Sequence, residues 1–140
     1  MNMEKVELGK LYFEEGIPGF VNLQFFRLLS EDANSPFYVL QSYEQEEQVE
    51  FWAVDPFMFF QDYEFTLPQQ AKEQLRITED TAIAVVNVVT VRPNGQVTVN
   101  LKAPIIINRE NRMAKQVILN DEKYELRKPL FQLPVTATSE

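Results

Sequence analysis

Two carboxylates, Asp62 and Glu64, are the best candidates for catalysis in this sequence of 140 residues. If residues 62–67 form a strand, both side chains point to the same face, because they stand two residues apart. Such a pair can share a proton and perform general acid–base chemistry, as in a carboxylate-dependent hydrolase. A solvated strand face would give the same spacing without any chemistry.

A divalent cation could bind the four glutamates between residues 44 and 50, but they lack the Asp-rich, glycine-containing loop that orders calcium ligands. The sequence also has no histidine and no cysteine. This excludes Ser-His and Cys-His triads, thiol catalysis, disulfides, and zinc sites built from those ligands. Glycine-rich phosphate loops are missing as well. We therefore expect a protein that needs no cofactor or metal.

Residues 55–60, Asp-Pro-Phe-Met-Phe-Phe, form the most unusual string in the chain. Three phenylalanines and a methionine in four positions cannot all point inward from one strand. Exposed, they would form an apolar patch of the kind that marks protein interfaces. A turn that buries all of them is the alternative. Asp55, Phe57 and Phe59 are candidate partner-binding residues, together with the nearby Asp62 and Glu64.

A second candidate group is cationic: Arg109, Arg112 and Lys115 follow each other at i, i+3 and i+6. On a helical turn they would share a face and could contact an acidic group of a partner. In an exposed loop they would only be solvated. Asn108, Arg109 and Arg112 are the candidate partner-binding residues of this segment.

Charge is distributed unevenly. The chain has 21 acidic and 13 basic residues, net −8, but residues 1–70 carry 13 acidic and 3 basic groups, whereas residues 71–140 carry 8 and 10. A negative domain repels phosphate backbones, so direct nucleic-acid binding is not expected. The acidic half could meet a basic protein partner or simply keep the protein soluble. Since no apolar run predicts a membrane span and no export signal begins the chain, we expect a cytoplasmic protein.

Short stretches rich in β-branched and aromatic residues, separated by turn residues, predict strands. Residues 37–43 and 49–54 predict a hairpin with an acidic tip. Residues 81–91 predict a long strand that returns through Asn94-Gly95, a signature of a type I′ hairpin turn. One short helix is expected between Thr66, which would form a capping box with Gln69, and about residue 75.

The predicted fold class is therefore all-β: a single small antiparallel β-barrel or sandwich with one short helix. Its domain spans residues 1–128. Residues 129–140 contain two prolines and end in polar residues, so a flexible C-terminal tail is expected there.

Five segments, in this order and spacing, resemble the flagellar assembly factor FliW family, and the resemblance covers roughly residues 7–125. They are Glu15-Gly16-Ile17-Pro18-Gly19-Phe20, Pro36-Phe37-Tyr38-Val39-Leu40-Gln41-Ser42, Asp55-Pro56-Phe57-Met58-Phe59-Phe60 with Asp62-Tyr63-Glu64-Phe65, Leu101-Lys102-Ala103-Pro104-Ile105-Ile106-Ile107-Asn108, and Ala114-Lys115-Gln116-Val117-Ile118-Leu119. The segment 24–29 and the acidic loop 44–48 do not match the family pattern, nor does the chain after residue 128.

The resemblance implies a small β-barrel-like bacterial protein without enzymatic activity, which binds flagellin and also the RNA-binding translational repressor CsrA. It further implies that CsrA is inhibited non-competitively, away from its RNA site, so that repression of flagellin synthesis is relieved. We expect the free protein to be a monomer. Two alternatives remain open: a small-ligand-binding β-barrel, which needs an interior cavity, and the carboxylate hydrolase.

Overall fold

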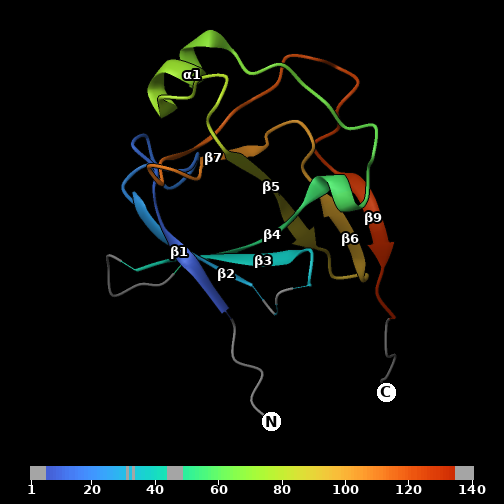
Figure 1. The fold of residues 1–140 in the computed structure, drawn as a ribbon. Helices are drawn as coiled ribbons and strands as arrows, with labels where there is room; N and C mark the ends of the chain where they lie inside the picture. Colours follow the sequence, from blue (N-terminus) through green and yellow to red (C-terminus); the bar gives the residue numbers. More distant parts are fainter. Residues whose placement is uncertain (1–5, 31, 33, 44–48, 135–140) are drawn as a thin grey trace.

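The computed structural model describes residues 6–30, 32, 34–43 and 49–134, with the side chains of residues 6 and 7 left out. The described chain forms nine strands, one α-helix and one short 3₁₀ helix (Figure 1). The elements in chain order are β1 (Val6–Tyr12), β2 (Phe25–Ser30), β3 (Phe37–Ser42), β4 (Glu50–Val54), η1 (Pro56–Met58), α1 (Gln69–Leu75), β5 (Ile83–Val91), β6 (Gln96–Val99), β7 (Ile105–Asn108), β8 (Ala114–Gln116) and β9 (Lys128–Gln132).

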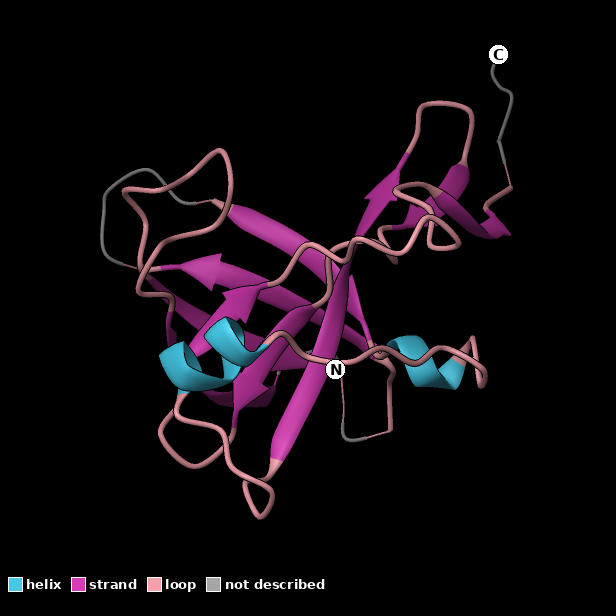
Figure 2. Cartoon of the chain, turned by 90° about the horizontal axis from the view of Figure 1, so that it is seen from above, coloured by secondary structure: helices cyan, strands magenta, loops and turns pink. Residues whose placement is uncertain are grey.

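All strand pairs are antiparallel, and the main sheet has the order β1-β2-β3-β4-β5-β6-β9. The long strand β5 organises the fold, because its second half pairs with β4 and β6 and its first half pairs with β7. β8 extends the sheet beyond β7. The sheet curls into an open half-barrel (Figures 1 and 2). The predicted all-β class with one helix is confirmed.

The two faces of the curled sheet bury separate hydrophobic cores. Successive strand residues point to opposite faces, and β7 shows the result: Ile105 and Ile107 belong to the first core, whereas Ile106 belongs to the second. The first core also contains Phe13, Phe26 and Leu40; the second contains Val54, Tyr63, Leu75, Val99 and Tyr124. Because both faces of the sheet are covered at β7, three consecutive residues of this strand are isoleucines, and apolar and polar residues do not alternate there.

Both predicted hairpins form, but the second has a different turn. β3 pairs with β4, and the acidic tip at 44–48 lies outside the described residues. Between β5 and β6, Gly95 has a positive φ of 87° but Asn94 does not, so the turn is not type I′. Pro93 fixes its own φ near −65°, which suits a type I turn followed by a left-handed glycine. The Gly95 amide accordingly donates to the Arg92 carbonyl at 2.9 Å.

Three other expectations need correction. Helix α1 begins after Pro68 without a side-chain cap, so Thr66 is not its N-cap. Residues 62–67 form no strand. Residues 129–132, expected in a flexible tail, lie in β9, which pairs with β6. β9 is mostly exposed, and its only two hydrophobic residues besides Pro129, Leu130 and Phe131, are adjacent and do not alternate with polar ones, so the sequence alone carried little strand signal. Residues 135–140 lie outside the described chain.

Candidate functional site

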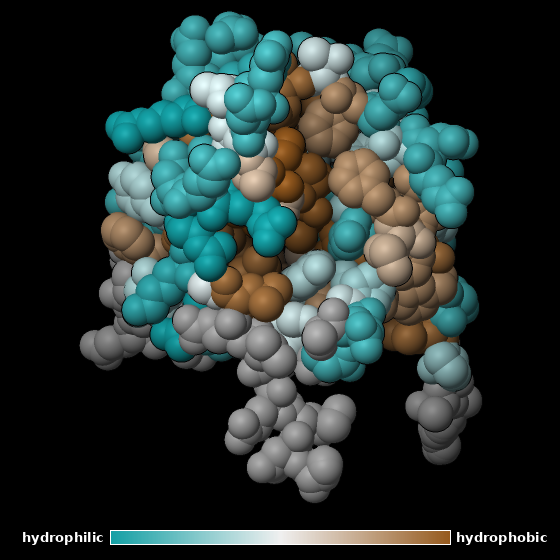
Figure 3. All heavy atoms as spheres, in the orientation of Figure 1, coloured by the Kyte–Doolittle hydropathy of each residue, from teal (hydrophilic) through white to brown (hydrophobic). Residues whose placement is uncertain are grey.

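A groove with a volume of about 740 Å³ opens on the face of the half-barrel shown in Figure 3. There, hydrophobic side chains (brown) gather at the centre of the face and hydrophilic ones (teal) border them. Strands β1, β2, β3, β5 and β7 contribute to the groove, as do the segments after β4 and β7. Its lining residues are Leu8, Leu28, Tyr38, Asp55, Phe57, Ile83, Ala84, Val85, Val86, Ile107, Arg109 and Arg112.

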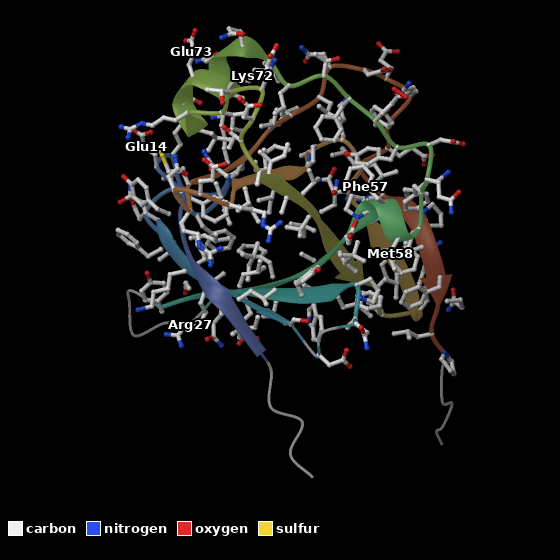
Figure 4. The ribbon with its side chains drawn as sticks, viewed as in Figure 1. Glu14, Arg27, Phe57, Met58, Lys72 and Glu73 are labelled. Atoms are coloured by element: carbon white, nitrogen blue, oxygen red, sulfur yellow. The ribbon has the colours of Figure 1, made fainter. Side chains whose placement is uncertain are left out.

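One wall of the groove is set by the turn that ends β4. Pro56 has no N–H to donate to a neighbouring strand, and the Asp55 carboxylate accepts a hydrogen bond from the Phe57 amide at 2.9 Å. The chain therefore leaves the sheet as the 3₁₀ helix η1. Of the two alternatives for this string, the structure shows the exposed one: Phe57 is 42% exposed and Met58 is 63% exposed. Figure 4 shows both side chains on η1, far from α1.

The opposite wall contains Arg112, which joins two parts of the chain. Its guanidinium donates to the Leu8 carbonyl at 2.6 Å, and its own carbonyl accepts from the Tyr12 amide at 2.9 Å. The guanidinium lies directly beside Gly9. Gly9 has a φ of 131°, a conformation that other residues rarely adopt, and this explains the glycine in β1. Arg112 thus connects β1 to the turn between β7 and β8, across the open side of the half-barrel.

The expected helical face of Arg109, Arg112 and Lys115 does not form. Arg109 and Arg112 lie in the turn after β7, where Arg112 has a φ of 68°, and Lys115 lies in β8. The Lys115 ammonium pairs with Glu15, and its hydrogen bond lowers the pKa of that carboxyl group. A tight turn between two short strands brings only the two arginines to the groove.

The groove also holds a phenol next to a carboxylate. Burial, and secondarily the negative charge of Asp55, raises the pKa of Tyr38. Tyr38 therefore stays protonated at neutral pH and can donate a hydrogen bond. A carboxylate, a phenol and two guanidinium groups around an apolar floor are suited to recognition of another molecule.

The structure brings four of the eight candidate residues together in the groove: Asp55, Phe57, Arg109 and Arg112. The other four lie elsewhere. Asp62 and Glu64 flank the buried Tyr63 and line two different depressions. The hydrolase hypothesis requires both carboxylates to lie in one pocket, and they do not. The ring of Phe59 packs against that of Phe37, with 5.9 Å between centroids.

Asn108 is buried rather than available to a partner, with 2% of its surface exposed. Its side-chain amide donates to the carbonyl of Leu75 at 2.7 Å, and its side-chain oxygen accepts from the amide of Glu110 at 2.9 Å. These contacts connect α1 to the turn after β7. Asn108 therefore holds the cationic turn in place.

Sequence reasoning missed the apolar part of the groove, chiefly Leu8, Leu28, Ile83 and Val85. The β-branched run 81–91 correctly predicts a strand, but it does not reveal that the first half of this strand borders a groove. Pro56 is the signal that could have revealed the groove, because it ends β4 before this strand has paired with the whole of β5. Among the described residues, no group of His, Cys, Asp or Glu is arranged to hold a metal ion.

Fold and groove together define a small antiparallel half-barrel that carries, on one face, an apolar groove bordered by charged side chains. A family model described as "FliW protein" matches residues 1–130. The chain is 44% identical to the flagellar assembly factor FliW of Caldicellulosiruptor saccharolyticus, over 93% of this chain and 85% of that protein. It is 40% identical to the flagellar assembly factor FliW of Bacillus subtilis, over 93% and 90% of the two chains.

A crystal structure of the flagellar assembly factor FliW superposes with a TM-score of 0.79, at 38% identity, covering 87% of this chain and 85% of that one. The chain belongs to the FliW family. This confirms the resemblance of the five sequence segments. FliW proteins are flagellar assembly factors, a regulatory family and not a family of enzymes. In the described part of the chain, α1 is far too short to cross a membrane, and no other α-helix is present.

Proposed function

We propose that this chain is a regulator of flagellar assembly that binds flagellin and antagonises the translational repressor CsrA in the cytoplasm. In this proposal, flagellin export frees the protein to bind CsrA, and repression of flagellin synthesis is relieved. The observation that carries the proposal is the groove, which unites Asp55 and Phe57 with Arg109 and Arg112 across more than fifty residues of sequence.

The composition of the groove favours a protein as its partner. Aromatic side chains and arginine are enriched in the centres of protein interfaces, and Phe57 is exposed beside the apolar floor. The small-ligand alternative is less well supported, because large side chains such as Phe13, Phe26 and Leu40 fill the inside of the curl.

The charge of the chain supports non-competitive antagonism. A protein of net charge −8 does not resemble RNA-binding surfaces, but when bound to a basic repressor it would repel RNA from the complex. Two unit charges 10 Å apart in water interact by only about 0.4 kcal/mol. The acidic groups of residues 1–70 must therefore act together, and salt must weaken their effect.

Calorimetry with purified flagellin and with purified CsrA tests the proposal directly. We expect binding of both partners at micromolar concentration or tighter. Flagellin added to the preformed complex with CsrA should release CsrA if the two compete. The proposed function would be refuted if the protein bound neither flagellin nor CsrA.

Phe57 and Phe59 offer a matched pair for testing the groove. They are exposed to similar extents, 42% and 38%, and stand two residues apart, but only Phe57 lines the groove. Phe57→Ala should weaken binding of the groove's partner by about tenfold or more, as is typical of a central aromatic contact. Phe59→Ala should have a smaller effect. The melting temperature of each variant separates lost contacts from lost stability, and equal losses of affinity in both would contradict the assignment.

A further inference from the structure

The first half of β5 has one backbone edge that pairs with no strand of the described chain. The Arg109 amide donates to the Ala82 carbonyl at 2.9 Å, in register with the β5–β7 ladder. Because the direction of backbone groups alternates along a strand, Ala84 and Val86 also point their N–H and C=O groups toward β7. Ile83 and Val85 point theirs to the opposite side. We call these groups of Ile83 and Val85 the free edge of β5.

The opposite side is where β4 would continue. β4 pairs with β5 as far as Val54, opposite Asn87, and then the chain turns away into η1. The next positions along β4 would have been Asp55 and Pro56, and Pro56 cannot donate a hydrogen bond to a ladder. The free edge is therefore left open where β4 stops, and both its residues line the groove.

We infer that the groove binds an extended segment of a protein partner, which pairs as an additional strand with the free edge of β5. This inference rests on the proposed function, because it states how the proposed partner is held. An unpaired strand edge is a template for a further strand, and peptide recognition by strand addition uses such edges. The groove offers a volume of about 740 Å³ beside this edge.

The groove also specifies the chemistry of this segment. Leu28, Val86 and Ile107 give it an apolar floor, so every second side chain of the segment should be apolar. Arg109 lies at the Ile83 end, since its amide pairs with Ala82. Its guanidinium forms no ion pair within the described chain.

Asp55 lies at the other end of the free edge, next to Val54 and Asn87. The segment should therefore carry a carboxylate near Arg109 and no negative charge near Asp55. Charge complementarity of this kind fixes the orientation of a bound segment more than its affinity. A second copy of this acidic chain is a less suitable occupant, because the two copies repel each other.

Amide hydrogen exchange, followed residue by residue in the full chain with and without flagellin and with and without CsrA, tests the inference. In the free protein, Ala84 and Val86 should exchange slowly and Ile83 and Val85 faster. The bound partner should slow exchange at Ile83 and Val85 by at least about tenfold. Binding without this protection would overturn strand addition and leave the proposed function intact. If neither partner binds, both proposals fail. Protection that grows with the concentration of the chain alone would point to a second copy and overturn the inference.

Substitution of Ile83 provides an independent readout. Ile83→Pro removes one N–H of the free edge without removing a hydrogen bond to β7, and should weaken partner binding by about tenfold. Ile83→Val keeps the N–H and an apolar side chain, and should change affinity by less than about twofold. Equal affinities of the two folded variants would contradict the inference. If Ile83→Pro does not fold, the exchange experiment on the unaltered chain still decides.

Arg109→Glu tests the predicted carboxylate of the segment. It should weaken binding, and the loss should shrink at high salt. Arg127→Glu is the matched control, because Arg127 is exposed and lies outside the groove while the change in net charge is the same. An equal loss for both variants would show that only total charge matters and would overturn the assignment of Arg109.

Discussion

At the scale of single residues, the second core contains a polar cluster that the hydrophobic pattern of the sequence does not predict. The Tyr63 hydroxyl donates to the Leu101 carbonyl at 2.7 Å. The side-chain amide of Asn87 donates to the same hydroxyl at 3.2 Å and to the Asn100 carbonyl at 2.8 Å. Because buried polar groups are costly unless they are hydrogen-bonded, this cluster fixes the segment after η1 against β5 and the loop after β6.

Ionisation of Tyr63 lowers the free energy of unfolding at alkaline pH. Burial raises its pKa to about 12, although the hydrogen bond from Asn87 opposes the shift. An unfolded tyrosine has a pKa of about 10. The folded state therefore holds the proton more tightly, and the contribution of Tyr63 to stability is complete below about pH 10 and is lost as pH rises toward 12.

Urea unfolding between pH 8 and pH 11.5 checks this prediction. The free energy of unfolding should fall more steeply above pH 10 in the unaltered chain than in Tyr63→Phe, which cannot titrate at this position. The variant should also be less stable at pH 8, since it leaves the Leu101 carbonyl without its donor. Identical slopes in the two proteins would contradict the assignment.

At the scale of elements, the position of the cationic turn depends on α1. This helix has only seven residues, too few to be stable alone. Its buried Ala71 and Leu75 hold it in the second core, and Arg76 ends it in the left-handed conformation, with a φ of 58°. Asn108 then satisfies the Leu75 carbonyl at the open end of the helix.

Asn108→Ala should therefore reduce the stability of the protein, because Asn108 has a structural role and does not contact a partner. The substitution removes the shorter of two side-chain hydrogen bonds to the Leu75 carbonyl, which keeps the bond from the Asn111 side-chain amide at 3.2 Å. It also leaves two backbone amides of the turn without their side-chain acceptor. We expect the free energy of unfolding to fall by about 2 kcal/mol and the melting temperature by about 6 °C. Asn120→Ala, at an exposed position, should change neither. Partner affinity lost at an unchanged melting temperature would instead make Asn108 a contact residue.

At the scale of the whole molecule, the acidic excess should act on the rate of association. The first half of the chain has a net charge of −10 and the second half +2, and oppositely charged partners attract each other over several ångströms of solvent. Association with CsrA, the proposed partner, should therefore slow by about tenfold when salt rises from about 50 to 500 mM. Stopped-flow mixing measures this rate, and circular dichroism verifies that the fold is the same at both salt concentrations. A rate independent of salt would mean that the charge only maintains solubility.

Much of the fold could be predicted because local rules govern it. Alternation and β-branched residues located β3, β4, β5 and β6. The failures have physical causes as well. Thr66 offered a capping signal, yet the chain enters the helix only after Pro68. β9 gains its strand conformation from pairing with the edge of β6, a contact that its own sequence does not encode.

The sequence by itself determined the all-β class, the family and the acidic charge, because each depends on composition or on neighbours within a few residues. Only the tertiary structure decided which candidates share a site. Arg109 and Arg112 reach Asp55 and Phe57 because the sheet curls and β5 pairs with both β4 and β7. Asn108 is adjacent to the arginines in sequence, but it is buried under α1. The strand order and the curvature of the sheet arise from contacts between residues that are distant in sequence, so no local sequence pattern predicts them.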